Sequence, residues 1–126
     1  MGMDMNLYRA RCVDDIDHYY ATWDIYKSNE YEYELDGEED DIMPVAEIYY
    51  SRKFWDLYEA MSFTKDYHCG EYIRLSKKQV KEMLDYSVLH PDYFGDFNTV
   101  VNLCRIYYKF DEWERRGLHV FFECDW

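Results

Sequence analysis

Three carboxylates and one imidazole crowd into the run Asp-Asp-Ile-Asp-His at residues 14–18. The ionisable members are Asp14, Asp15, Asp17 and His18. Clustered carboxylates can bind a divalent cation, since Ca²⁺ and Mg²⁺ prefer oxygen ligands. The run lacks the central Gly and terminal Glu of a calcium loop. We therefore interpret it as a solvated acidic turn, with a cation site as the less favoured reading.

Thiols and imidazoles are the other candidates for metal chemistry. The chain has four cysteines, Cys12, Cys69, Cys104 and Cys124, and no pair of them has the short spacing of a zinc site. His68 and Cys69 are adjacent, a spacing that rarely allows both side chains to bind one metal ion. We predict no metal and no cofactor, and we interpret Cys12 and Cys104 as small buried apolar residues.

Motifs of catalysis are missing from the sequence. No G-x-S-x-G nucleophile motif, Walker motif or phosphate-binding glycine loop occurs. Nothing in the sequence supplies an activated nucleophile or a paired base. We expect that the protein is not an enzyme; a small enzyme of unknown reaction stays as an alternative.

The most polarised stretch is residues 28–41, with eight acidic residues and no Lys or Arg. Within it, the run Glu-Tyr-Glu-Tyr-Glu-Leu at 30–35 alternates charged and apolar side chains, which predicts a half-buried strand. Asp36-Gly37 is a turn signal. Alternate residues of a strand lie about 6.5 Å apart on one face, so the glutamates would form a row of negative charge.

Charge favours a basic protein as the partner. The formal net charge is -13, from 14 basic and 27 acidic residues, which opposes direct binding to nucleic acid or to an anionic membrane. DNA carries about one charge per 1.7 Å of its axis, so a basic channel that accepts phosphates could accept a row of carboxylates. The predicted partner-binding residues are Glu30, Tyr31, Glu32, Tyr33, Glu34, Asp36, Glu38, Glu39, Asp40 and Asp41. An acidic loop with no partner is an equally weighted interpretation.

Aromatic residues suggest a different function. The chain has 15 Tyr, 7 Phe and 4 Trp, and aromatic side chains are favoured at protein interfaces. If residues 16–27 are helical, Tyr19, Tyr20, Trp23 and Tyr26 form a stripe. The alternative hypothesis is therefore a homo-oligomeric structural or scaffolding protein, and the expected state is a monomer or a small homo-oligomer.

Strands are predicted at both ends of the chain. Residues 3–13 partly alternate, with Met5 and Leu7 sharing one face. At the other end, 118–126 place Leu118, Val120 and Phe122 on one face. Residues 14–26 fit either a short helix or a second strand.

Three helices are predicted between these strands. The spacing of Tyr50, Phe54, Leu57, Tyr58 and Met61 predicts a helix over 45–62, opened by Pro44. Ser76 and Gln79 have the spacing of a capping box for a helix that ends by Leu89. The third helix is expected over 98–116 and stops at Gly117.

These elements predict an α+β fold, with about three helices packed on a small antiparallel sheet formed with the N- and C-terminal strands. The length of 126 residues fits one domain spanning 1–126. An apolar signal-peptide core and an apolar run long enough to cross a membrane are both missing, so we expect no membrane association and reduced thiols.

Several segments resemble a family of small phage and prophage proteins of unknown function. The start, MGMDMNLYRA, is similar to that family's M-G-[LM]-D-M-x-L opening. Residues 47–61 resemble its Y-W-R-K-type helix, with Ser51 in place of the family's Trp and without its His. Residues 68–84 resemble its C-G-E-Y segment, and VFFECDW resembles its aromatic, Trp-terminated tail.

The resemblance implies a phage origin and an α+β fold, and no activity. Phage origin would place the protein in the cytoplasm of a bacterial host. Combined with the acidic charge, it suggests an inhibitor of a host defence or nucleic-acid-binding protein, of anti-CRISPR or anti-restriction type, that acts as a DNA mimic. The expected partner is a host protein with a basic surface.

Overall fold

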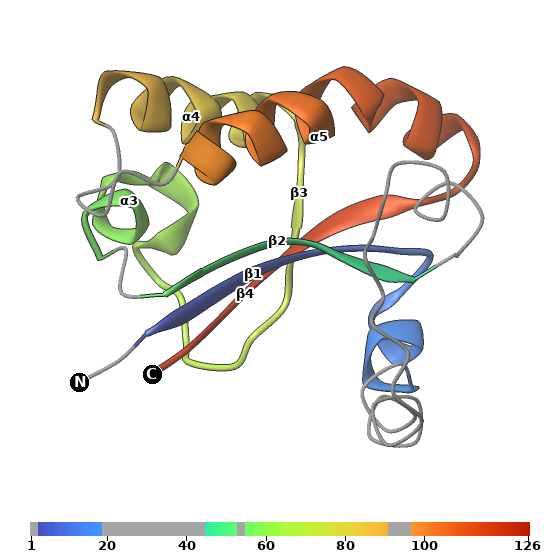
Figure 1. Ribbon diagram of the computed structural model, residues 1–126. Helices are drawn as coiled ribbons and strands as arrows, with labels where there is room; N and C mark the ends of the chain where they lie inside the picture. The colour runs from blue at the N-terminus through green and yellow to red at the C-terminus, as the bar shows by residue number, and fades with distance from the viewer. Residues whose placement is uncertain (1–2, 19–44, 53–54, 91–96) are drawn as a thin grey trace, which may run out of the picture.

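A four-stranded antiparallel sheet forms the centre of the protein, with strand order β2-β1-β4-β3. The computed structural model describes residues 3–18, 45–52, 55–90 and 97–126 (Figure 1). The strands are β1 (Asp4–Ala10), β2 (Ala46–Arg52), β3 (Ile73–Leu75) and β4 (His119–Asp125). The described helices with assigned bounds are α3 (Trp55–Ala60), the 3-10 turn η1 (Ser62–Thr64), α4 (Lys77–Leu89) and α5 (Phe97–Arg115). The predicted α+β class is confirmed.

The first and last strands lie side by side at the middle of the sheet. Asp4 is opposite Asp125, and the register continues without interruption to Ala10 opposite His119. The described N-terminal and C-terminal segments therefore end at the same edge of the molecule (Figure 1). The predicted pairing of these two strands is confirmed.

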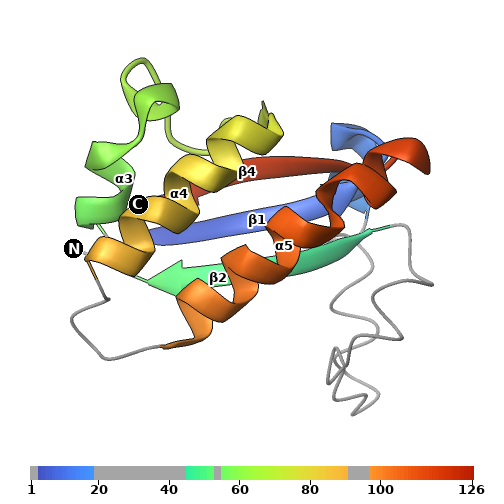
Figure 2. The same ribbon diagram turned by 90° about the horizontal axis from the view of Figure 1, so that it is seen from above.

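One face of the sheet is covered by α4 and α5, which lie side by side across it (Figure 2). Met5 and Leu7 of β1 point to this face and are fully buried, as the alternation predicted. The predicted residues Val120 and Phe122 of β4, and Leu118 just before it, join them, and α5 adds Leu103, Ile106, Phe110 and Trp113. This is the larger of the two apolar clusters.

The opposite face of the sheet is apolar at one end only. There, Tyr8 and Ala10 pack with Phe121, Val45 and Ile16 in a second, smaller cluster. Ile16 comes from residues 13–18, which are helical and lie below the sheet in Figure 1. The other end of this face is polar, and it carries the candidate site.

The capping box that Ser76 and Gln79 predicted is present at the start of α4. The Gln79 backbone N–H donates to Ser76 Oγ at 3.2 Å, and the Ser76 backbone N–H donates to Gln79 Oε1 at 2.8 Å. Two N–H groups without helical partners are thus satisfied at once. The helix ends at Leu89, as expected.

The helix predicted over 45–62 is wrong for its first half, because residues 46–52 form strand β2 and only Trp55–Ala60 are α-helical. Of the residues whose spacing predicted the helix, only Tyr50 belongs to β2, and it is 53% exposed. Leu7 is opposite Tyr49 and Tyr8 is opposite Glu47, so Ile48 has no partner across the ladder. This extra residue breaks the two-residue alternation of the strand, so β2 lacks the period that identifies a strand.

Candidate partner-binding face

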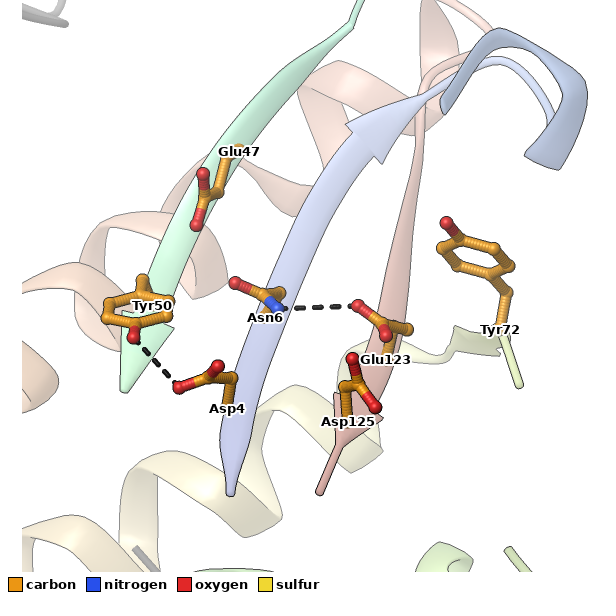
Figure 3. A pocket seen from close by; sticks show the side chains of 7 residues that line it. All are labelled: Asp4, Asn6, Glu47, Tyr50, Tyr72, Glu123 and Asp125. Carbon is orange, nitrogen blue, oxygen red and sulfur yellow. Dashed lines mark hydrogen bonds between the residues drawn. The ribbon is translucent and has the colours of Figure 1, made fainter. Parts of the chain in front are cut away.

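A shallow hollow of about 410 Å³ lies on the polar end of the sheet face that α4 and α5 leave open. Figure 3 shows the side chains that line it, which come from all four strands or their immediate flanks. The described residues lining it are Asp4, Asn6, Glu47, Tyr50, Tyr72, Glu123 and Asp125. We call the carboxylates of Asp4, Glu47, Glu123 and Asp125 the acidic face.

Glu47 and Glu123 flank the central strand β1. Tyr8 is opposite Glu47 on β2, and Asn6 is opposite Glu123 on β4. Burial raises the pKa of Glu47 above its ordinary value, and the negative charge of Glu123 raises it further. Burial also raises the pKa of Glu123; the hydrogen bond from Asn6 acts against this, and Asp125 and Asp4 act with it. Both carboxylates are therefore destabilised in their ionised form, by lost solvation and by repulsion from neighbouring negative charges.

Asn6 forms the floor of the hollow between these two glutamates. Only 8% of its surface is exposed, and its Nδ2 donates to Glu123 Oε2 at 3.3 Å. At the edge, Tyr50 Oη donates to Asp4 Oδ1 at 2.9 Å, and that bond is the main reason the pKa of Tyr50 is raised. Both hydrogen bonds are drawn in Figure 3.

Tyr72 closes the side of the hollow nearest the helical residues 13–18. Its hydroxyl donates to Asp17 Oδ1 at 3.4 Å. Burial, followed by the charges of Asp17 and Glu123, raises the pKa of Tyr72 to about 12. One basic side chain, the exposed Arg52, lies on the strand position opposite Asp4.

The acidic run at 14–18 is helical, one of the two alternatives predicted for residues 14–26, and does not form the solvated turn. Asp15 accepts a hydrogen bond from Arg11 Nε at 2.9 Å, and Asp17 accepts one from Tyr72. Among the residues that the structure describes, no three His, Cys, Asp or Glu side chains converge as metal ligands.

The burial predicted for the cysteines is wrong for Cys12, which is exposed, and Cys104 is only half-buried. Cys12 follows the end of β1, in the bend before residues 13–18, where no element covers it in the described part of the chain. Cys124 is the buried cysteine, because it points from β4 into the larger core. Burial raises the pKa of its thiol.

All ten predicted partner-binding residues, from Glu30 to Asp41, lie outside the described residues, as does the predicted strand at 30–35. The aromatic stripe of residues 19–26 lies outside them too. The acidic face was not predicted. A signal for three of its four carboxylates exists in the sequence, since Asp4 and Asn6 alternate with Met5 and Leu7, and Glu123 and Asp125 alternate with Phe122 and Cys124.

Aromatic rings gather beside the two chain ends. Trp126 lies 5.9 Å from Trp55, 5.7 Å from Tyr58 and 6.0 Å from Tyr67, measured between ring centroids. The Tyr67 hydroxyl accepts from the Cys124 backbone N–H at 2.6 Å and donates to the Glu71 carbonyl at 2.6 Å. Tyr67 thus ties the segment before β3 to the last strand.

The chain matches no protein-family model, no curated protein and no solved structure. A search of its described helices for one long and apolar enough to span a bilayer found none.

Proposed function

We propose that this protein is an acidic, phage-type binding protein that inhibits a host defence or other nucleic-acid-binding protein by occupying its basic surface. The observation that carries the proposal is the acidic face. Four carboxylates lie on one open sheet face; Glu47 and Glu123 are half-buried, and each experiences the negative charge of a neighbouring carboxylate. A basic surface would offset the repulsion that these groups experience in the free protein.

The charge of the whole chain also favours a basic partner. The net charge is -13, while α4 and α5 together carry six basic and five acidic residues, so the excess lies away from those helices. A net negative charge of this size steers a basic partner toward the protein. A phage origin, which the resemblance to small phage proteins implies, would suit an inhibitor of host defence. Catalysis has less support, because the sequence contains no motif of an activated nucleophile.

A capture experiment tests the proposal. The tagged protein is incubated with bacterial host lysate at low salt, and bound proteins are displaced with duplex DNA and identified by mass spectrometry. We expect DNA to release a nucleic-acid-binding protein, because both ligands would compete for one basic surface. A parallel variant removes charge by Gln or Asn substitution at Glu30, Glu32, Glu34, Glu38, Glu39, Asp40 and Asp41.

If duplex DNA does not displace the captured protein, mimicry of nucleic acid is ruled out. If the segment variant alone loses a DNA-displaceable partner, residues 30–41 carry the recognition as the sequence predicted. If it keeps that partner, the recognition belongs to other acidic residues, with the acidic face as the first candidate.

Self-association is a second candidate function, favoured by exposed apolar side chains on α4 and α5. Val101 and Tyr108 are 62% and 78% exposed and lie seven residues apart, on one side of α5. Val88 and Leu89 are exposed near the end of α4. Salt separates the two functions, because rising salt weakens charge-driven binding and leaves apolar self-association intact.

A further inference from the structure

The helical layer formed by α4 and α5 exposes most of the large apolar side chains that reach the surface. Of the six that are exposed among the described residues, four lie on these two helices, namely Val88, Leu89, Val101 and Tyr108. Figure 2 looks onto this layer from the side away from the sheet. Exposed apolar side chains that gather on one part of a soluble protein mark an interaction surface.

The two helices run antiparallel, which brings these side chains together. Lys77 at the start of α4 pairs with Asp111 in the second half of α5, at 2.8 Å between Nζ and Oδ2. The end of α4, with Val88 and Leu89, therefore lies near the start of α5, where Val101 is placed. The apolar surface thus crosses from one helix to the other.

Charge identifies a second copy of the chain as the partner for this surface. The chain has a net charge of -13, whereas α4 and α5 together carry six basic and five acidic residues. Two copies repel each other wherever their acidic surfaces meet, and a nearly neutral surface avoids most of that repulsion. A strongly basic partner gains little from a neutral surface, so the helical layer suits self-association better than it suits such a partner.

The outward side of α5 carries opposite charges on the two sides of Tyr108. Val101 precedes Tyr108 by two turns, Arg105 precedes it by one turn, and Glu112 follows it by one turn. These spacings place the four residues on one side of the helix. Glu112 is exposed and Arg105 is half-buried. A two-fold axis through Tyr108 reverses the chain direction in the second copy, so each Arg105 lies opposite the Glu112 of the other copy.

We propose that two copies of the protein associate through α5, with the two helices antiparallel and Tyr108 on the two-fold axis. The inference rests on the self-association named above as the second candidate function, and it does not depend on inhibition of a host protein. The two Tyr108 rings pack against each other at the centre of the contact, and two pairs of Arg105 with Glu112 flank them. Because the contact is two-fold symmetric, each favourable interaction occurs twice.

The symmetry of this dimer leaves both acidic faces accessible. The acidic face lies on the side of the sheet that α4 and α5 leave open, away from the proposed contact (Figure 1). A dimer formed through α5 therefore presents two acidic faces on its outer sides. Such a particle is bivalent toward any basic partner.

Charge reversal tests the arrangement, with the full chain followed by sedimentation velocity over a wide range of protein concentration. Glu112→Arg should raise the dissociation constant of the dimer about tenfold or more, because it places two basic side chains opposite each other in both pairs. Arg105→Glu should have a similar effect. The double variant restores opposite charges and should return close to the wild-type dissociation constant. Glu59→Arg makes the same change of charge at an exposed position on α3 and is the matched control.

Removal of the central ring tests the apolar part of the contact. Tyr108→Ser should raise the dissociation constant about tenfold or more, since a central aromatic side chain carries much of the energy of an interface. Tyr50→Ser is the matched control, because it removes an exposed tyrosine from the opposite side of the sheet. Arg105 also interacts within its own chain, so thermal unfolding is used to verify that each variant is folded.

A wild-type protein that stays monomeric at every concentration would overturn the inference together with the self-association on which it rests. A dimer that tolerates Tyr108→Ser and Glu112→Arg would overturn this arrangement and leave self-association standing. Weakening in both charge reversals without recovery in the double variant would also exclude the antiparallel order. The inhibitory function is decided separately by the capture experiment, which depends on displacement by DNA.

Discussion

Glu47 and Glu123 lie diagonally across strand β1, opposite Tyr8 and Asn6, and the charge of Glu123 raises the pKa of Glu47. Both carboxylates are half-buried, so each loses solvation as well as experiencing repulsion. A protein that retains such a pair in its free state keeps a surface that a cation stabilises. The ionised pair therefore destabilises the free protein, and its effect on the free energy of unfolding can be measured.

Glu47→Gln should stabilise the protein at pH 7 by about 0.5–1 kcal/mol. Because the pKa of Glu47 is raised in the folded state, the folded protein binds this proton more tightly than the unfolded chain does. That stabilisation is complete below the ordinary pKa of glutamate and is lost as pH rises through the folded value. At pH 7 the ionised carboxylate thus weakens the fold, and glutamine removes its charge.

Urea unfolding at pH 7 and at about pH 4 verifies this prediction. The difference between wild type and Glu47→Gln should shrink at the lower pH, where Glu47 takes up its proton. Glu59→Gln is the matched control, since Glu59 is exposed on α3 and should change stability little at either pH. A destabilised Glu47→Gln at pH 7 would show that the carboxylate is stabilised by contacts that outweigh the repulsion.

Ser76→Ala should lower the free energy of unfolding by about 1 kcal/mol, since it removes the N-cap acceptor of α4. The Gln79 backbone N–H would lose its partner at the first turn. Ser76→Asp keeps an acceptor there and should stay close to wild type, with help from the helix dipole. Equal losses in the two variants would show that something other than capping is being measured.

The elements with local signals could be predicted from the sequence. The capping box at Ser76 and Gln79 depends on residues three apart, and the alternation of Met5 with Asn6 depends on immediate neighbours. For α5, the apolar spacing around Leu103 and Phe110 predicted a helix with nearly the observed ends. In each of these cases the chemistry that fixes the element lies inside a window of a few residues.

The remaining elements depend on pairing with strands that are distant in the sequence. Strand β2 was predicted as a helix because the bulge at Ile48 is defined only by its pairing with Leu7 and Tyr8. Strand β3 has three residues, too few to show a period, and it exists through its ladder with β4. The acidic face combines Asp4, Glu47 and Glu123, which only the sheet order brings together.

Tyr67→Phe should lower the free energy of unfolding by about 1–3 kcal/mol. The Tyr67 hydroxyl accepts from the Cys124 N–H and donates to the Glu71 carbonyl, so its removal deprives two backbone groups of a partner. Tyr58→Phe is a close control, because Tyr58 belongs to the same aromatic cluster, 6.0 Å from Tyr67 between ring centroids. No described residue hydrogen-bonds to the Tyr58 hydroxyl, so a change below about 0.5 kcal/mol is expected.

Chemical denaturation of the two variants gives the comparison directly. A loss in Tyr67→Phe no larger than in Tyr58→Phe would show that water replaces the hydroxyl without penalty. Unchanged denaturant slopes are needed for the comparison, since a changed slope would indicate a different unfolded or native state.

The cysteines should react with alkylating reagents in the order of their exposure. Cys12 and Cys69 are exposed, whereas Cys124 is fully buried and burial raises the pKa of its thiol, which disfavours the reactive thiolate. Iodoacetamide at pH 8, followed by peptide mass mapping over time, should modify Cys12 and Cys69 first. Cys124 should react slower by about a hundredfold or more, at the rate of local opening.

Denaturant provides the internal control for this order. In urea all four thiols should react at similar rates, since the protection of Cys124 comes from the packing of β4 against the core. Tyr67→Phe should also speed the modification of Cys124 under native conditions, because the lost hydrogen bond loosens the strand that carries it. Rapid native modification of Cys124 in the wild type would contradict its burial and, with it, the placement of the last strand in the core.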